Sequence, residues 1–561
     1  MTTDKISVQR LVEICFLRGL RQVVISPGSR NAPLTIAFHE HGGFSCHTVP
    51  DERVAAFYAM GQALASGKPS IICCTSGSAA LNYAPAIVES YYQGIPLLVL
   101  TADRPVDWID TGIGQSMRQH DVYSNYIKKS FQIKQEAVNG EDLRYNDNIF
   151  IEAIEATISK VPGPVHINMP FCEPLYGRAK EGDFSDIVPN SIKSSAANDI
   201  SNELLEDLSQ IWKHSKRKLI LIGQGQSDNL LSQELSLLSQ ESVVILKEAT
   251  SNLNIDGALS CIDRVLAGIT DFDKYKPDLL ITIGGAVVSK KIKSLLFDHK
   301  PDHHWDVRLD KARDTFKSLT QHLRVSGIEL IEKLPNSLNS TVFQSAWCDI
   351  ERRTKDAHTV YIDDIPFSDL KVFQILLSSL KNKAVLHLAN STPVRYTQLF
   401  DPSSSLTYMS NRGVSGIDGS TSTAIGYSTV NEERNYLITG DVSFFYDSNA
   451  FWNDNKRISN LKIILINNGG GGIFRYIPGP DTTNQLESVF ESHHQLTARP
   501  ICELYNLEYF MIDNSQEAES VLYDFINTDF DKIALLEIKT PRLKNAKVLR
   551  EYFKYIESVC G

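Results

Sequence analysis

The segments NYLITGD (435–441) and LKIILINNGG (461–470) each pass from an apolar run directly into a polar turn. The apolar runs predict two buried strands, and the 27 positions that separate Asp441 from Asn468 suit one strand–helix–strand crossover. Because such a crossover joins parallel strands, we expect both residues to lie at the carboxyl edge of one sheet. Open α/β sheets bind their ligands at that edge.

The residue types at this edge suit a hard cation and an anionic ligand. The Asp441 carboxylate, the Asn468 amide oxygen and a main-chain carbonyl near Gly470 would supply half of the octahedron that Mg²⁺ prefers. Backbone N–H groups around Gly440 and Ser443 could bind anionic oxygens. The alternative is two ordinary strand-ending turns, since Asp, Asn, Gly and Ser favour turns in any protein. The two turns together, at this interval, favour the metal site.

The same alternation of strand and helix extends through all 561 residues. The runs QVVIS (22–26) and SIICCT (70–75) predict strands, and the stretch 51–66 predicts a helix between them, the pattern of βαβ units; KLILIG (218–223) predicts a strand of a second such block. Polar stretches at 173–201 and 336–368 separate three blocks. We therefore predict an α/β fold of three doubly wound domains, each with a mainly parallel sheet: residues 1–180, 181–350 and 351–561.

Composition excludes several classes of protein. A formal net charge of -11 and a pI near 5.7 disfavour a nucleic-acid partner, which usually selects a basic surface. The nine cysteines form no CxxC pair and are odd in number, as expected for reduced thiols. No apolar run approaches the roughly 18 to 20 residues that span a bilayer, and the N-terminus lacks the apolar core of a signal peptide. We expect a cytoplasmic protein without a membrane span.

The GD and NN turns together resemble the metal-binding motif of thiamine diphosphate enzymes. This resemblance implies thiamine diphosphate held through Mg²⁺ or Mn²⁺, and pyrimidine-binding, middle and diphosphate-binding domains in that order. It also implies a glutamate that hydrogen-bonds N1′ of the aminopyrimidine, and Glu52 in PDERVAAF (50–57) matches it. Asp51 and Glu52 could instead be simple first-turn carboxylates of a helix. The family's sites lie between subunits, which implies a homodimer or homotetramer.

Further stretches resemble one branch of that family, the 2-succinyl-5-enolpyruvyl-6-hydroxy-3-cyclohexene-1-carboxylate synthases of menaquinone biosynthesis. The likeness covers all three blocks and is weakest in the middle one, where only GGAVVSKKIK (284–293) stands out. The other stretches are SPGSRNAPLT (26–35), TADRP (101–105), GQSMRQ (114–119), NSTPVR (390–395), SNRGVSGIDG (410–419) and GGIFRYIP (471–478).

The resemblance implies a reaction in which 2-oxoglutarate is decarboxylated and the resulting carbanion adds to isochorismate. Both substrates are dianions, and guanidinium groups bind carboxylates through paired, charge-assisted hydrogen bonds. The resemblance assigns the succinyl arm to Ser391, Arg395 and Arg412. It assigns isochorismate to Ser29, Arg30, Arg104, Gln115 and Lys290. It gives Ile417 the support of the cofactor's V shape, and Ile473 and Phe474 the apolar wall of the site.

Some alternatives stay open at this point. Lys291 could bind substrate, or the run KKIK could be a solvated helix face. Another thiamine diphosphate enzyme, such as an acetolactate synthase or a 2-oxo acid decarboxylase, is the nearest rival, although it would not need so many arginines. A P-loop at GQALASGKPS (61–70) is excluded because its glycine spacing is wrong and Pro69 replaces the metal-binding hydroxyl.

Overall fold

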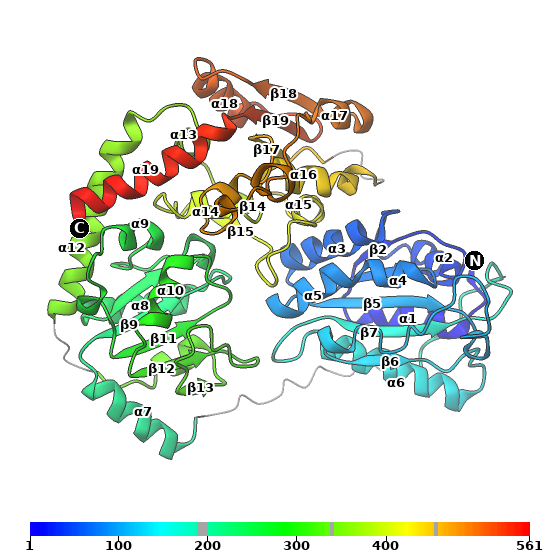
Figure 1. The fold of residues 1–561 in the computed structure, drawn as a ribbon. Helices are drawn as coiled ribbons and strands as arrows, with labels where there is room; N and C mark the ends of the chain where they lie inside the picture. The colour runs from blue at the N-terminus through cyan, green and yellow to red at the C-terminus, as the bar shows by residue number, and fades with distance from the viewer. Residues whose placement is uncertain (188–199, 337–340, 454–457) are drawn as a thin grey trace.

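The computed structural model describes residues 1–187, 200–336, 341–453 and 458–561. Three parallel sheets with helices on their faces form the body of the molecule (Figure 1). The expected α/β fold with mainly parallel sheets is therefore confirmed. One small antiparallel pair, β1 (Thr2–Thr3) with β8 (Arg178–Ala179), joins the N-terminus to the end of the first block.

The first sheet has the strand order β3-β2-β4-β5-β7-β6, and every pairing in it is parallel. Its inner strands are buried on both faces, which explains their continuous apolar sequences. The strands are β2 (Gln22–Ile25), β3 (Ser45–Thr48), β4 (Ser70–Cys74), β5 (Leu97–Asp103), β6 (Ser130–Gln132) and β7 (Val165–Pro170). The helices are α1 (Ile6–Leu17), α2 (Ala32–His41), α3 (Glu52–Ser66), α4 (Ser78–Asn82), α5 (Ala84–Gln93) and α6 (Gly140–Thr157).

The middle sheet has five parallel strands in the order β10-β9-β11-β12-β13. They are β9 (Lys218–Ile222), β10 (Val244–Lys247), β11 (Leu279–Ile283), β12 (His303–Val307) and β13 (Gln321–Leu323). Its helices are α7 (Asn202–His214), α8 (Asn229–Gln240), α9 (Ile262–Ala267), α10 (Lys290–Asp298) and α11 (Gly327–Ile331).

The third sheet has the order β15-β14-β16-β17-β19-β18, again parallel throughout. Its strands are β14 (Ala384–Leu388), β15 (Leu406–Met409), β16 (Asn435–Gly440), β17 (Leu461–Asn467), β18 (Glu508–Ile512) and β19 (Ala534–Lys539). Its helices are α12 (Thr341–Asp363), α13 (Asp369–Ser379), α14 (Thr392–Thr397), α15 (Ser420–Ser428), α16 (Asp441–Tyr446), α17 (Arg499–Tyr505), α18 (Ala518–Asn527) and α19 (Arg542–Cys560).

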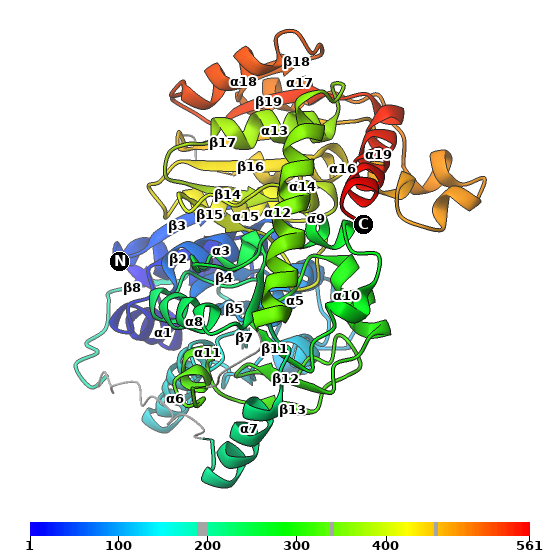
Figure 2. The same cartoon turned by 90° about the vertical axis from the view of Figure 1, so that its left-hand side faces the viewer.

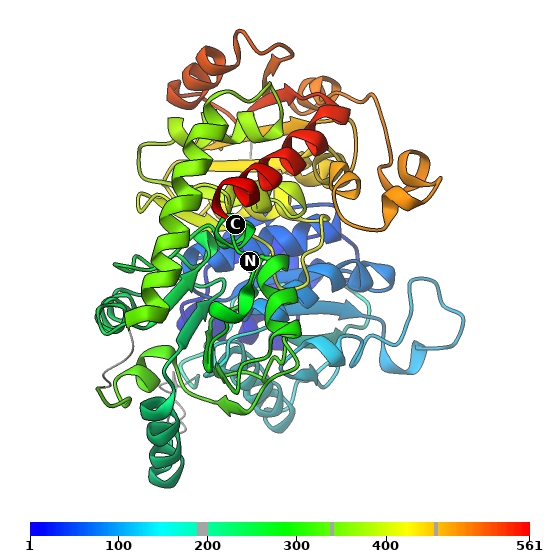
Figure 3. The ribbon, with the colours of Figure 1, turned by 60° about the vertical axis from the view of Figure 1, so that its left-hand side comes forward.

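The polar stretch at 336–368 is mostly one long helix, α12, which runs beside the middle block and packs against α9 and α19 (Figure 3). Phe343, Trp347 and Ile350 recur at helical spacing and are buried, so α12 presents an apolar stripe within a polar sequence. The predicted domain limit at residue 350 falls inside this helix, and the domain limits stay predictions. Of the polar stretch at 173–201, residues 188–199 lie outside the described residues.

The first and third blocks are held together by the helices α3 and α15. A Cβ atom on Gly61 would lie 2.1 Å from the carbonyl oxygen of Thr423, and one on Gly426 would lie 2.0 Å from that of Tyr58. Only glycine at both positions permits this approach, which brings the two backbones into direct contact. The contact holds the middle of α3 against α15 of the third block, and Figure 2 shows the two helices side by side.

No described helix is long and apolar enough to cross a membrane.

Candidate active site

The turn at Gly440 and Asp441 and the turn at Asn467 and Asn468 meet in the structure. Gly440 pairs with Ile466 in the parallel ladder of β16 and β17, so both strands end at the same sheet edge. There the Asp441 carboxylate accepts hydrogen bonds from the N–H groups of Gly469 and Gly470, at 2.7 and 2.9 Å. The expected neighbourhood is confirmed, and the metal-binding role of its residues stays a prediction.

The oxygen atoms at this edge fit a hard cation. The Asn468 amide donates from Nδ2 to Asp369 at 3.0 Å, while its Oδ1 is buried without a hydrogen-bond partner. The Gly470 carbonyl accepts from the N–H of Gly472 at 2.9 Å and keeps a second lone pair. A buried amide oxygen without a partner is costly, and a metal ion would remove that cost.

The Asp441 carboxylate lies in a site that favours a positive charge. Its side chain is 2% exposed, and burial raises its pKa to about 6, although hydrogen bonds from the Gly470, Val442 and Gly469 N–H groups act in the opposite direction. The His494 Nε2 atom lies 3.5 Å from Asp441 Oδ2, but burial lowers the pKa of that imidazole, and burying a carboxylate without a full counter-charge is unfavourable. A divalent cation at this edge would stabilise the ionised form.

Three other predicted cofactor residues join this edge. The Ser443 hydroxyl donates to the Ile417 carbonyl at 2.8 Å, which holds the loop before α15 against the start of α16. Gly440 is the N-cap residue of α16 and directly precedes Asp441. Ile417, Gly440, Asp441, Ser443 and Asn468 therefore form one cluster in the third block.

Glu52 lies at the first turn of α3, in the first block. The helix is capped by Asp51, whose side chain accepts from the Val54 N–H at 3.2 Å, so the capping role does not fall to Glu52. The Glu52 carboxylate contacts the Asn82 amide at 3.5 Å and is half-buried. This arrangement leaves the Glu52 side chain able to meet a ligand.

The residues assigned to the succinyl arm gather between the middle and third blocks. Arg412 is buried and donates to Asn390 at 2.8 Å, and Arg395 donates to the Val288 carbonyl at 3.2 Å. The Nε atoms of both arginines are buried without partners. Ser391, just before α14, has a φ of 73°, an unusual value for a residue other than glycine. Strain of this kind is typical of functional sites.

Lys290 and Lys291 are the first two residues of α10. The Lys291 Nζ lies 3.8 Å from the centre of the Phe553 ring, on the side of α19. Lys293, three residues after Lys290 and so on the same helix face, lies near the arginine group. Burial lowers the pKa of Lys293, and the charges of Arg412, Arg395 and Lys290 lower it further, against Glu248.

The remaining residues assigned to isochorismate lie at the carboxyl edge of the first sheet. Arg30 is 2% exposed, donates to the Phe171 carbonyl at 2.9 Å and pairs with Glu173 at 3.0 Å. Arg104 donates to Gln115 at 3.4 Å. Ser29 directly precedes Arg30 in the same loop. Lys290 begins α10 in the middle block, so the predicted isochorismate set is divided between two blocks of one chain.

Ile473 and Phe474 belong to the short helix η6 (Gly472–Arg475), which begins beside the metal edge. A Cβ atom on Gly472 would lie 3.2 Å from Asn468 Nδ2. The Phe474 ring lies 5.8 Å from that of Phe490, and both predicted wall residues are half-buried. An apolar segment therefore follows the predicted metal ligands directly.

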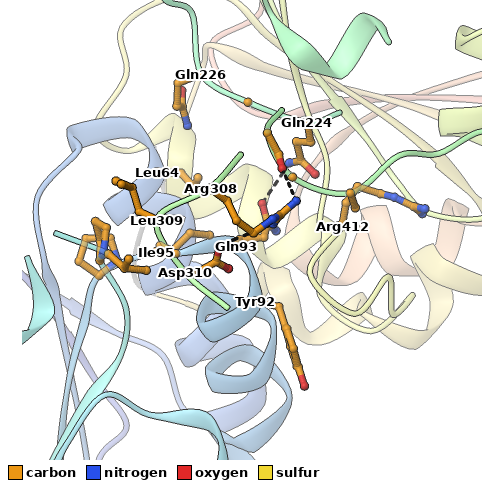
Figure 4. A pocket seen from close by; sticks show the side chains of 18 of the residues that line it. Leu64, Tyr92, Gln93, Ile95, Gln224, Gln226, Arg308, Leu309, Asp310 and Arg412 are labelled. Atoms are coloured by element: carbon orange, nitrogen blue, oxygen red, sulfur yellow. Dashed lines mark hydrogen bonds and ion pairs between the residues drawn. The ribbon is translucent and has the colours of Figure 1, made fainter. Parts of the chain in front are cut away.

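A cavity of about 980 Å³ lies where the three blocks meet (Figure 4). Gln224 of the middle block crosses it, donating to Gln93 at 3.0 Å and to the Ser410 carbonyl at 2.8 Å. Arg412 reaches this cavity, whereas Glu52 and Asp441 are not among its lining residues. The predicted cofactor residues thus do not line this cavity.

The comparisons with known proteins agree with this geometry. Residues 7–125 match the family described as "Thiamine pyrophosphate enzyme, N-terminal TPP binding domain", and residues 391–538 match its C-terminal counterpart. The first range contains Glu52, and the second contains Asp441 and Asn468.

Close relatives share one name, "2-succinyl-5-enolpyruvyl-6-hydroxy-3-cyclohexene-1-carboxylate synthase". The chain is 40% identical to that of Christiangramia forsetii, with both chains fully covered. It is 42% identical to that of Flavobacterium psychrophilum, over 97% of this chain and 98% of the relative. It is 38% identical to that of Porphyromonas gingivalis, over 99% and 98%. The chain belongs to the 2-succinyl-5-enolpyruvyl-6-hydroxy-3-cyclohexene-1-carboxylate synthase family.

Three further residues at this site are not identified by the sequence alone. Asp369 contacts Asn468, Glu248 accepts from the Val288 and Ser289 N–H groups, and Lys293 lies beside the arginine group. The three-residue spacing of Lys290 and Lys293 was a usable signal. Asp369 and Glu248 had none, because their partners are 99 and 40 to 41 positions away in sequence.

Replacing Asp441 by alanine should weaken the binding of metal and cofactor together. The change removes one hard ligand of a six-coordinate cation, so activity should require much more Mg²⁺ and thiamine diphosphate. Titration of activity with each component measures the effect, and Asp531→Ala, an exposed carboxylate before β19 at the opposite end of the strands, is the control. Superimposable titration curves for Asp441→Ala and the unchanged enzyme would show that the metal lies elsewhere.

Proposed function

We propose that the chain decarboxylates 2-oxoglutarate and adds the remaining four-carbon unit to isochorismate, giving 2-succinyl-5-enolpyruvyl-6-hydroxy-3-cyclohexene-1-carboxylate. The observation that carries this proposal is the near full-length identity to relatives with this product in their name. The reaction also explains why two separate groups of cationic side chains accompany one cofactor motif, since both substrates are dianions.

The protein's part in this reaction is to bind, orient and exclude water. Bound thiamine diphosphate supplies the nucleophilic carbon and the electron sink for decarboxylation. Arg395 and Arg412 would hold the carboxylate of the succinyl arm, and the low dielectric around them strengthens that interaction. Ile473 and Phe474 would keep water from the reacting carbon. Glu52 would hold a proton at N1′ of the aminopyrimidine ring.

We further propose a homodimer or homotetramer with active sites between subunits. Two observations on this chain support it. Glu52 makes its one described side-chain hydrogen bond to Asn82 of its own block, and neither Glu52 nor Asp441 lines the cavity where the three blocks meet. A second copy would let the first-block group of one subunit face the third-block group of the other. Within the cell, the free cysteines suit the cytoplasm.

Replacing Glu52 by glutamine should leave cofactor binding nearly unchanged and slow the exchange of the thiazolium C2 proton. Glutamine keeps the size of the side chain but cannot share the N1′ proton as a carboxyl group does. Exchange into deuterium oxide, quenched with acid and followed by NMR, measures the rate. Exchange at the normal rate in Glu52→Gln would remove Glu52 from the mechanism.

Separate arginine substitutions should distinguish the two substrates. Arg30→Ala and Arg104→Ala should still release CO₂ from 2-oxoglutarate with an artificial electron acceptor, yet form little adduct with isochorismate. Arg395→Ala should lose CO₂ release itself at ordinary 2-oxoglutarate concentrations. Leaving a buried carboxylate unpaired costs on the order of 2 to 5 kcal/mol, so each loss should be tens to thousands of fold.

The control for these variants is Arg434→Ala, an exposed arginine that pairs with Asp529 at 3.1 Å. It should retain both partial reactions. The division of the site is inverted if Arg395→Ala releases CO₂ normally while Arg104→Ala does not. Because Arg30 also holds Phe171 and Glu173, Arg104→Ala is the cleaner test of the isochorismate group.

A further inference from the structure

Behind the predicted metal edge lies a buried carboxylate, Asp369, which is the first residue of α13. It is 2% exposed, and its Oδ2 accepts a hydrogen bond from Asn468 Nδ2 at 3.0 Å. Its Oδ1 accepts from the Thr540 hydroxyl at 2.6 Å and from Asn545 Nδ2 at 2.9 Å. Every described side-chain partner of this carboxylate is a donor.

A role in capping α13 does not account for these contacts. The N-cap residue of that helix is Ser368, whose side chain accepts from the Lys371 N–H at 3.4 Å. The Asp369 carboxylate turns away from its own helix toward the strand ends of the sheet, where it meets Asn468 and Thr540. Its N–H is separately bound by Asn545 Oδ1 at 3.0 Å, which fixes the backbone at this point.

The contact with Asp369 determines which way the Asn468 amide faces. An amide group has one end that donates and one that accepts, and the two ends are almost equal in size. An ionised carboxylate only accepts, so the donating end must face Asp369. The accepting end, Oδ1, is then directed away from Asp369, and it is the buried oxygen without a partner at the predicted metal edge.

We propose that Asp369 is a positioning residue that fixes the Asn468 amide with its oxygen toward the metal ion. Without it, the amide could turn its NH₂ group to the cation. The ligand oxygen would then be replaced by N–H groups, whose positive ends repel the metal ion. The inference rests on the proposed cofactor and metal site and adds to it a residue that touches neither.

The isosteric variant Asp369→Asn makes the test. Its side chain has only one accepting atom, and Thr540 and Asn545 both donate to the side opposite Asn468. An NH₂ group would then face Asn468 and favour the reversed amide. Outer-shell partners of this kind typically change metal affinity by roughly 10- to 100-fold. We expect the Kd for Mn²⁺, measured by electron paramagnetic resonance with thiamine diphosphate present, to rise by about that factor.

Two further variants separate positioning from general damage. Thr540→Val removes a neighbouring hydrogen bond on Asp369 but leaves the contact with Asn468, so its Kd for Mn²⁺ should stay within about 2-fold of the unchanged protein, well below the outer-shell effect. The double variant Asp369→Asn with Asn468→Asp exchanges the donor and the acceptor. The amide introduced at position 369 can then donate to the carboxylate introduced at position 468, which presents an oxygen to the metal whichever way it turns. The double variant should therefore bind Mn²⁺ more tightly than Asp369→Asn alone.

The outcomes are distinct. Weak binding in Asp369→Asn, with recovery in the double variant, supports the proposal. Equal binding in Asp369→Asn and the unchanged protein overturns it, as do additive losses in the double variant. If circular dichroism shows that Asp369→Asn does not fold, the Kd for Mn²⁺ of Asn468→Asp is compared with that of the double variant. The proposal is overturned if adding Asp369→Asn to Asn468→Asp does not tighten Mn²⁺ binding. An unchanged protein that binds no Mn²⁺ overturns the metal site itself.

Discussion

The parallel pairing of β16 with β17 is the constraint on which the site depends. It ends two strands at one edge and so sets a carboxylate, Asp441, beside an amide, Asn468, that are 27 positions apart in sequence. The edge is buried, which makes each of its polar atoms costly unless a partner satisfies it. Backbone N–H groups and Asp369 meet part of that demand, and a cation at the predicted site would meet the rest. The same burial strengthens every charge interaction with an anionic ligand.

Contacts between the three blocks place the other predicted site residues relative to this edge. The close approach of α3 and α15 needs glycine on both helices and holds the middle of α3, the helix that begins with Glu52, against the third block. Arg53 continues this contact by pairing with the buried Asp447 at 3.0 Å, and Asp447 also accepts from Ser422. Gln224 ties the middle block to the other two. The positions of the cationic groups are thus set by packing between blocks, in addition to the strand order within each sheet.

The sequence predicted what repeats locally and missed what depends on tertiary packing. Strand runs, the helix at α3 and the meeting of Asp441 with the NN turn follow from short-range pattern, and the structure confirms them. The sequence of α12 predicts a polar separator because its apolar residues are sparse, and only the tertiary structure shows that they form one buried stripe. No sequence pattern indicates the role of Asp369, because a carboxylate is common in the first turn of a helix and its partner Asn468 is distant in sequence. Substrate assignments came from resemblance, not from spacing.

The most direct test of the account is the identity of the product. The protein is incubated with thiamine diphosphate, Mg²⁺, 2-oxoglutarate and isochorismate, and the mixture is analysed by mass spectrometry. The account predicts one CO₂ for each molecule of 2-succinyl-5-enolpyruvyl-6-hydroxy-3-cyclohexene-1-carboxylate formed. Release of succinic semialdehyde with isochorismate left unchanged, or turnover of pyruvate to acetolactate in place of 2-oxoglutarate, would contradict it.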